Sequence, residues 1–471
     1  MEQMFNEFHT AILTTNSSLL ASTVTPAAPH HDPGRLYSIL RSTNAYSIEA
    51  DVRYGLNYGR EASLRKAQSA AWVDVYTAYY KVISLVLAAE EKTNQGKLRE
   101  ANWNAVYDAW KEVSNALVKG FNGGHIEGWA TPCLYVAGRY LREFAIKADE
   151  ASVKTKGAVT FNAGFQDDIV GALDNQEKLE DAARQINRVF SLCLTDRAPL
   201  EESRRWGVYY ITNLLFKTYF KLNSISLSKS LIRSLTASAS ELPDLSFFPK
   251  SHQITYNYYV GVVAFLEEDY SKAETHLTTA YALCPAVPFA HKNRSLILTY
   301  LIPCRLLTTH TLPTEAMLKP YASLQRLFGP LIKCIRRGDL AGFDNALVAG
   351  EGDFVKRRIY LTLERGRDIA LRNLFRKVFL AGGYEPLKEG QTEADKVRRT
   401  RIPLAEFAAA VRLGMKAEVR EGGAGEGGLE QDEVECMLAN LIYKNLMKGY
   451  ISRGHSMVVL SKAGAFPGTG V

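Results

Sequence analysis

The sequence has few cysteines and no long apolar run, and each shortage excludes a class of protein. Six cysteines are spread over 471 residues without a CxxC pair, which excludes a disulfide framework and a zinc knuckle. No apolar run reaches the roughly 18 residues that a membrane-spanning helix needs. Glu2 and Glu7 precede the first basic residue, unlike in a secretory signal. We therefore expect an intracellular, soluble protein that does not associate with membranes.

Signatures of catalytic sites are missing as well. Residues 125–127 (HIE) and 132–133 (PC) resemble the start of a zinc-deaminase signature, but Val136 stands where the second cysteine is needed. Elsewhere the histidines and cysteines lack the spacing that places two metal ligands on one helix face. There is no phosphate-binding glycine loop and no G-x-S-x-G elbow. We expect a protein that is not an enzyme and holds neither a metal nor a cofactor.

Basic residues are unevenly distributed along the chain, whose formal charge is +7. Residues 326–401 contain 17 basic and 10 acidic side chains, which accounts for the whole excess. A field of one sign favours a polyanion, because phosphate contacts release counterions. Nucleic-acid contact is therefore one interpretation. The alternative is a solvated helix face whose cations lie beside acids such as Glu364 and Asp368.

Apolar spacing predicts helices over most of the chain after about residue 64. Trp72, Tyr76, Tyr79 and Ile83 follow the three- and four-residue steps of a buried helix face. Convincing strand alternation is absent from the first 400 or so residues, so successive helix pairs favour an α-solenoid. Further helices are expected from about residue 98 and over 129–151, 176–194, 289–307, 321–336, 339–348 and 359–381.

The first 60 residues differ from the rest of the chain in composition and in apolar periodicity. They are rich in Ser, Thr, Ala and His, and Pro26, Pro29, Pro33 and Gly34 interrupt any long periodicity. One short helix near residues 4–13 fits the pattern. We expect the rest to be a poorly ordered arm.

One helix pair resembles a tetratricopeptide repeat. The repeat places small residues where its two helices pack and a proline after the second helix. An asparagine occupies the position of its aromatic anchor, so the alternative is a generic helical hairpin. The matching positions are Asn257, Val260, Gly261, Ala264, Ala273, Leu277 and Pro285.

The pattern changes after residue 401. A short edge strand at 401–404, a helix at 405–413, a glycine-rich loop at 421–428 and a helix at 432–448 precede a β-hairpin over 449–460. Strand, helix, helix, hairpin is the order of a winged helix. The predicted fold is therefore all-α, a TPR-like solenoid followed by a winged helix. Its parts are an arm (1–60), a helical-repeat domain (61–245), a TPR-like part (246–400), the winged helix (401–462) and a flexible tail (463–471).

A helical array that ends in a winged helix resembles the PCI family of scaffold subunits, found in the proteasome lid, the signalosome and translation-initiation complexes. Three segments resemble one particular branch of this family: residues 187–197 (NRVFSLCLTDR), 206–229 (WGVYYITNLLFKTYFKLNSISLSK) and 436–452 (CMLANLIYKNLMKGYIS). They look like the PCI subunit of the TREX-2 transcription and mRNA-export complex, a branch also named signalosome subunit 12-like. Coverage runs from about residue 64 to 461.

This resemblance implies a nuclear adaptor in mRNA export, also present in the cytoplasm and at the nuclear pore. Its partners would be a large Sac3/GANP-type helical scaffold and a small acidic Sem/Dss-type peptide. The winged helix would contribute a basic platform that holds RNA or DNA by phosphate contacts. The residues expected to bind nucleic acid are Lys356, Arg357, Arg358, Arg372, Arg376, Lys377, Arg398, Arg399, Arg401, Lys444, Lys448 and Arg453.

A second hypothesis is a scaffold that binds only proteins, as a subunit associated with the signalosome or the proteasome lid. Its basic face would dock acidic partner segments, and its winged helix would mediate subunit contact alone.

Overall fold

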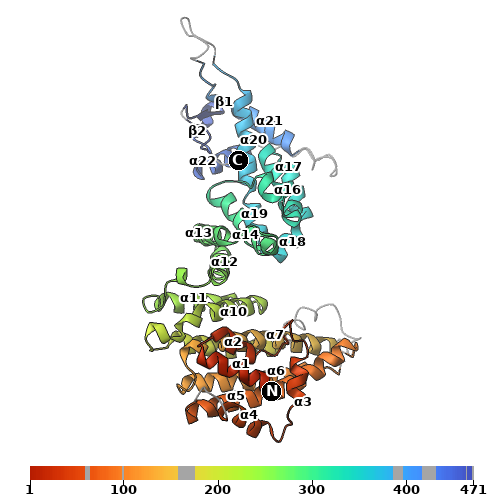
Figure 1. Ribbon diagram of the computed structural model, residues 1–471. Helices are drawn as coiled ribbons and strands as arrows, with labels where there is room; N and C mark the ends of the chain where they lie inside the picture. Colours follow the sequence, from red (N-terminus) through yellow and green to blue (C-terminus); the bar gives the residue numbers. More distant parts are fainter. Residues whose placement is uncertain are drawn as a thin grey trace. The chain divides into compact units, whose positions relative to one another are not determined.

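The computed structural model describes residues 1–58, 64–97, 100–156, 176–385, 396–415, 431–462 and 464–468. The predicted 421–428 loop lies outside these residues. The chain is mostly helical and divides into an N-terminal unit, Met1–Tyr259, and a C-terminal unit, Val260–Val471 (Figure 1). None of the described helices combines the length and the apolar character needed to cross a bilayer. The predicted class, a helical array with a C-terminal winged helix, is confirmed.

Consecutive helices pack against one another through the N-terminal unit. Trp110 illustrates the core: its side chain is fully buried, its Nε1 donates to the carbonyl oxygen of Ala137 at 2.9 Å, and its ring lies 5.9 Å from that of Phe144. The helices of this unit are α1 (Glu2–Leu13), α2 (Ser17–Thr23), α3 (Arg35–Arg41), α4 (Ile48–Asn57), α5 (Lys66–Asn94), α6 (Trp103–Asn122), α7 (Pro132–Lys156), α9 (Glu177–Leu194), α10 (Val208–Lys221) and α11 (Ile225–Ala237), with α12 (Lys250–Leu266) crossing the boundary.

The N-terminal residues form a packed layer, so the expectation of a poorly ordered arm over 1–60 is wrong. Helices α1 to α4 occupy most of residues 2–57. Phe8 of α1 is fully buried, with its ring 5.3 Å from that of Trp72 and 5.7 Å from that of Tyr76 on α5. The prolines lie between α2 and α3, where they end one short helix without preventing the next. Apolar burial against α5 outweighs the weak helical pattern.

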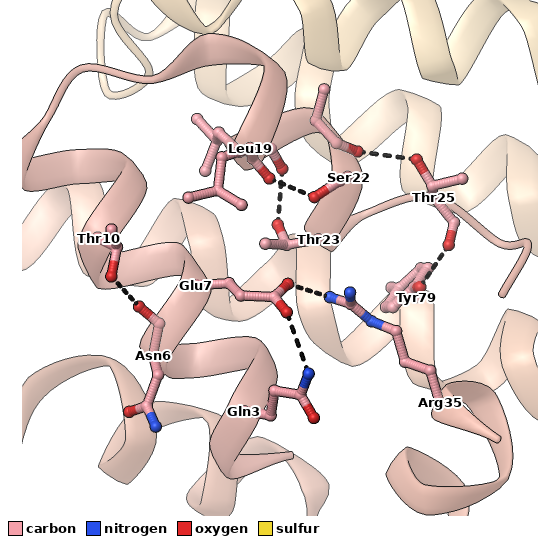
Figure 2. A network of polar contacts seen from close by, with 12 residues as sticks. Gln3, Asn6, Glu7, Thr10, Leu19, Ser22, Thr23, Thr25, Arg35 and Tyr79 are labelled. Atoms are coloured by element: carbon pink, nitrogen blue, oxygen red, sulfur yellow. Dashed lines mark hydrogen bonds and ion pairs between the residues drawn. The ribbon is translucent and has the colours of Figure 1, made fainter. Parts of the chain in front are cut away.

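Polar contacts tie this layer together (Figure 2). Arg35 of α3 forms an ion pair with Glu7 of α1, with Nη2 and Oε2 2.6 Å apart, and both side chains are largely buried. The Tyr79 hydroxyl donates to the carbonyl oxygen of Thr25 at 2.7 Å. The connection between α2 and α3 is thereby fixed to α5.

A buried carboxylate organises the connection between α9 and α10. Asp196 accepts hydrogen bonds from the Arg204 backbone N–H at 2.7 Å and from the Ser203 hydroxyl at 2.9 Å, and pairs with Arg204 Nη2 at 2.5 Å. Arg204 Nη1 also donates to the carbonyl oxygen of Phe121 at the end of α6. Burial by itself would raise the pKa of Asp196, but these hydrogen bonds outweigh it and hold the pKa well below its ordinary value.

The C-terminal unit begins with the TPR-like pair. Gly261 of α12 faces α13, where a Cβ atom would lie 2.7 Å from Leu277 Cγ, and Ala273 is fully buried. The helices that follow α12 are α13 (Tyr270–Leu283), α14 (His291–Thr308), α15 (Glu315–Leu318), α16 (Ala322–Arg337), α17 (Leu340–Ala349), α18 (Glu351–Lys356), α19 (Tyr360–Glu364) and α20 (Arg367–Ala381). The helix predicted over 359–381 is thus two helices with a turn at residues 365–366, where a Cβ on Gly366 would lie 2.7 Å from Leu306 Cδ2.

Replacing Gly261 by Ala is expected to lower the free energy of unfolding of the C-terminal unit by about 1–3 kcal/mol, because the added methyl must displace Leu277. Gly329 is a matched control inside helix α16, since a Cβ there would meet nothing within 4 Å. Gly329→Ala is expected to stabilise by up to about 1 kcal/mol. Urea unfolding followed by far-ultraviolet circular dichroism measures both variants; equal effects would contradict the close packing of this pair.

The winged helix comprises β1 (Arg401–Pro403), α21 (Leu404–Gly414), α22 (Gln431–Tyr443), β2 (Gly449–Ser452) and β3 (Met457–Leu460). The three strands form an antiparallel sheet in the order β1-β3-β2, with Ile402 opposite Val458. Phe407 of α21 and Leu438 of α22 are fully buried, and the Phe407 ring lies 5.0 Å from that of Phe375 on α20. Helix α22 ends earlier than the predicted residue 448, because Asn445 adopts a left-handed conformation (φ 55°) and turns Leu446 into the core.

Candidate interaction surface

Four of the twelve predicted phosphate-binding residues are paired with acids. Ion pairs between exposed groups add little stability, but each reduces the positive charge that a phosphate would meet. The hydrogen bond from Arg357 also lowers the pKa of Asp353. The pairs are Arg357–Asp353 at 2.5 Å, Arg399–Glu406 at 3.6 Å, Lys444–Asp368 at 2.5 Å, and Arg453 with Asp432 at 3.0 Å and Glu435 at 3.4 Å.

Two further cations bind carbonyl groups or rings of their own chain. Lys377 Nζ donates to the carbonyl oxygen of Arg337 at 2.6 Å. The Arg398 guanidinium lies 4.7 Å from the ring centroid of Tyr384 and donates to the carbonyl oxygen of Leu380 at 3.3 Å. Arg398 therefore joins the end of α20 to the segment that enters β1.

Arg372 is not presented to solvent in this structure, contrary to what its predicted contact with nucleic acid requires. Only 2% of Arg372 is exposed, because α20 and the C-terminal residues enclose it. Its Nη2 donates to the carbonyl oxygen of Pro467, and its Nη1 donates to Asn373 Oδ1, each at 2.8 Å. While the C-terminal residues cover it, this guanidinium does not meet a phosphate in solvent. The predicted flexible tail is thus partly packed, since Ala465 is buried too.

The remaining cations do not form one cluster on one element. Arg358 is exposed, with left-handed backbone (φ 58°), just beyond α18. Four others are exposed and have no acidic ion-pair partner among the described residues: Lys356 on α18, Arg376 on α20, Arg401 on β1 and Lys448 before β2. Their role in phosphate binding stays a prediction.

Aromatic side chains expose much of their surface near strand β2, a feature that the charge pattern did not indicate. Tyr450 on β2 is 63% exposed, and Tyr443 at the end of α22 is 90% exposed. Among the described strands, β2 pairs with β3 alone, so its other side is an edge of this three-stranded sheet. The alternation of the predicted hairpin was the sequence signal that could have placed Tyr450 on the outer face. The described residues contain no group of three or more His, Cys, Asp or Glu side chains that could hold a metal ion.

Comparison with known proteins assigns the family. The PCI domain model matches residues 354–462. "Protein CSN12 homolog" of Neurospora crassa is 52% identical over the full length of both chains, and the protein of the same name in Schizosaccharomyces pombe is 33% identical over 90% of each. "PCI domain-containing protein 2" of Danio rerio is 33% identical over 77% of this chain and 78% of its own.

These relatives correct the expected function. Their names refer to CSN12 and to the PCI domain, and none refers to the TREX-2 complex or to mRNA export. The prediction of an mRNA-export adaptor with an RNA- or DNA-binding platform is therefore overturned in favour of the alternative, a signalosome-associated PCI scaffold. On the strength of its full-length likeness to them, the chain belongs to the CSN12-like family of PCI-domain proteins.

Proposed function

We propose that this chain is a non-catalytic scaffold subunit of a signalosome-type assembly and that its winged helix contacts a neighbouring subunit. The observation that carries the proposal is the edge strand β2 with its exposed Tyr450, together with the exposed Tyr443 at the end of α22. The full-length likeness to proteins named CSN12 homologs supports the choice of assembly.

Strand β2 has the chemistry of a protein contact. An edge strand offers backbone N–H and C=O groups on which a second strand can add. Tyrosine is enriched at protein interfaces because it buries a large ring while its hydroxyl keeps a hydrogen-bond partner. The neighbouring cations Lys444 and Arg453 are paired with acids. This surface therefore suits another protein better than it suits a phosphate backbone.

The double variant Tyr443→Asp/Tyr450→Asp tests the proposed contact. We expect the tagged variant, purified from its own cells, to recover at least fivefold less of the signalosome subunits than the wild-type chain, because two charges would be desolvated in the interface. Mass spectrometry of the recovered proteins gives the ratio.

The matched control is Tyr46→Asp, a fully exposed tyrosine of the N-terminal unit, which should leave recovery unchanged. Unchanged recovery with the double variant would refute β2 as the contact. Absence of signalosome subunits from the wild-type purification would refute the proposed assembly. Nuclear localisation stays a prediction and is read from the same tagged cells by microscopy.

A further inference from the structure

Arg372 is a buried cation that lacks an anionic partner among the described residues. It lies on α20 with 2% of its surface exposed. Its two donated hydrogen bonds go to neutral oxygens, Asn373 Oδ1 and the carbonyl of Pro467, and its buried Nε has no acceptor. A buried polar group without a partner costs free energy, and a charged one costs more.

A second arginine on the same helix shows what this guanidinium geometry binds. Arg367 presents its Nε and Nη2 side by side to Asp344, and its Nε–Oδ1 and Nη2–Oδ2 distances are both 2.9 Å. Two parallel bonds of this kind are the strongest contact between an arginine and a carboxylate. Arg372 offers the same two donors, but only Nη2 is occupied, and its acceptor is a single backbone carbonyl.

Another arginine and a histidine lie close to the Arg372 guanidinium. Arg376 lies one turn further along α20, and burial together with Arg376 lowers the pKa of Arg372. His310, on the segment after α14, is close enough that burial and Arg372 lower its pKa. An anion at the free donor would relieve the repulsion between Arg372 and Arg376.

The described C-terminal residues, 464–468, cover Arg372 and contact α20 and the residue before β2. The Phe466 ring centroid is 5.6 Å from the Arg372 guanidinium and 5.8 Å from the Phe379 ring centroid. The carbonyl oxygen of Ala465 accepts a hydrogen bond from the Lys448 N–H at 2.7 Å. Gly464 and Gly468 lie at the two ends of this segment. A Cβ atom added at either glycine would meet no atom within 4 Å, and Gly464 has a φ of 73°. Release of the segment would therefore break one backbone hydrogen bond and the ring contacts of Phe466, while its two glycine ends are not closely packed.

We propose that Arg372 and Phe379 form a binding site for a partner segment in which a carboxylate follows an aromatic residue. Residues 464–468 of the same chain occupy this site and compete with the partner for it. The aromatic residue would replace Phe466 against Phe379. The carboxylate would replace the Pro467 carbonyl and satisfy both Nε and Nη2. This inference rests on the proposed role as a protein-binding scaffold and adds a second contact, distinct from the one proposed at the free edge of β2.

Two labelled peptides that differ by one charge test the site: fluorescein-Gly-Ala-Phe-Asp-Gly-amide and the same peptide with Asn in place of Asp. Fluorescence polarisation measures their binding to the full-length chain. With the Phe466→Ala variant, whose own segment is weakened, we expect the Asp peptide to bind at least tenfold tighter than to the wild-type chain. It should also bind at least tenfold tighter than the Asn peptide, because a charged acceptor roughly doubles the strength of the bond.

Arg372→Gln in the Phe466→Ala background should abolish the difference between the peptides, whereas Arg376→Gln, an exposed arginine one turn away, should retain most of it. Circular dichroism verifies that each variant is folded. If Arg372→Gln does not fold, Arg372→Lys replaces it, because lysine keeps the charge but lacks the paired donors. Arg372→Lys should remove most of the preference for the Asp peptide over the Asn peptide. Equal binding of the two peptides, no binding, or no gain from Phe466→Ala would overturn the proposal. Because the assay uses purified chain, it can fail while signalosome subunits still co-purify, or succeed while they do not.

Discussion

Phe8→Ala is expected to lower the free energy of unfolding of the N-terminal unit by about 3–5 kcal/mol, the usual cost of truncating a buried phenylalanine. Phe8 is fully buried between α1 and α5, where its ring contacts those of Trp72 and Tyr76. All five tryptophans of the chain lie in this unit, so tryptophan fluorescence in urea reports its unfolding selectively.

Tyr46→Ala is the matched control for Phe8→Ala. Tyr46 belongs to the same layer, between α3 and α4, but its side chain is fully exposed. Its truncation should change stability by less than about 0.5 kcal/mol. If Phe8→Ala had as small an effect as Tyr46→Ala, residues 1–58 would be an appendage and their packing on α5 would be wrong.

Asp196→Asn is expected to destabilise the same unit by about 3–5 kcal/mol at pH 7, because it leaves the mostly buried Arg204 guanidinium without its counter-charge. The folded-state pKa of Asp196 is lowered, so its contribution is complete above the unfolded pKa of about 4 and is lost as the pH falls further. The difference between wild type and Asp196→Asn should therefore shrink between about pH 4 and pH 2.

Asp74→Asn is the control that distinguishes loss of the buried Asp196 carboxylate from loss of an ordinary exposed ion pair. Asp74 pairs with Lys119 at 3.1 Å, but both side chains are more than half exposed, so its replacement should cost less than about 1 kcal/mol at pH 7. Urea unfolding at pH 7, 5 and 3 measures both variants. A cost for Asp196→Asn that is independent of pH would show that the carboxylate does not act through its charge.

Local patterns in the sequence predicted the long helices and the winged helix well. The apolar spacing in residues 72–83 corresponds to the buried face of α5, and the hairpin pattern after residue 449 corresponds to β2 and β3. Such patterns depend on neighbours a few residues apart, so the sequence alone contains them. The N-terminal layer was missed because its short helices depend on burial against α5, which no local pattern records.

The charges of the candidate surface were harder to predict, because their partners are distant in the sequence. Lys444 pairs with Asp368, 76 residues away, and Arg372 bonds to Pro467, 95 residues away. A count of basic residues cannot reveal that one cation is neutralised and another is buried. The earlier end of α22, at Tyr443, was missed too, since Leu446 turns into the core only in the folded chain.

The identity of the proteins that accompany the tagged chain from its own cells tests the proposed function most directly. The purification should include nuclease treatment, so that any recovered protein is held by protein contact. We predict that signalosome subunits are recovered and are retained after the nuclease. Recovery of a large Sac3/GANP-type scaffold with a small acidic Sem/Dss-type peptide in place of these subunits would contradict the proposed function. Loss of the partners on nuclease treatment would contradict it as well.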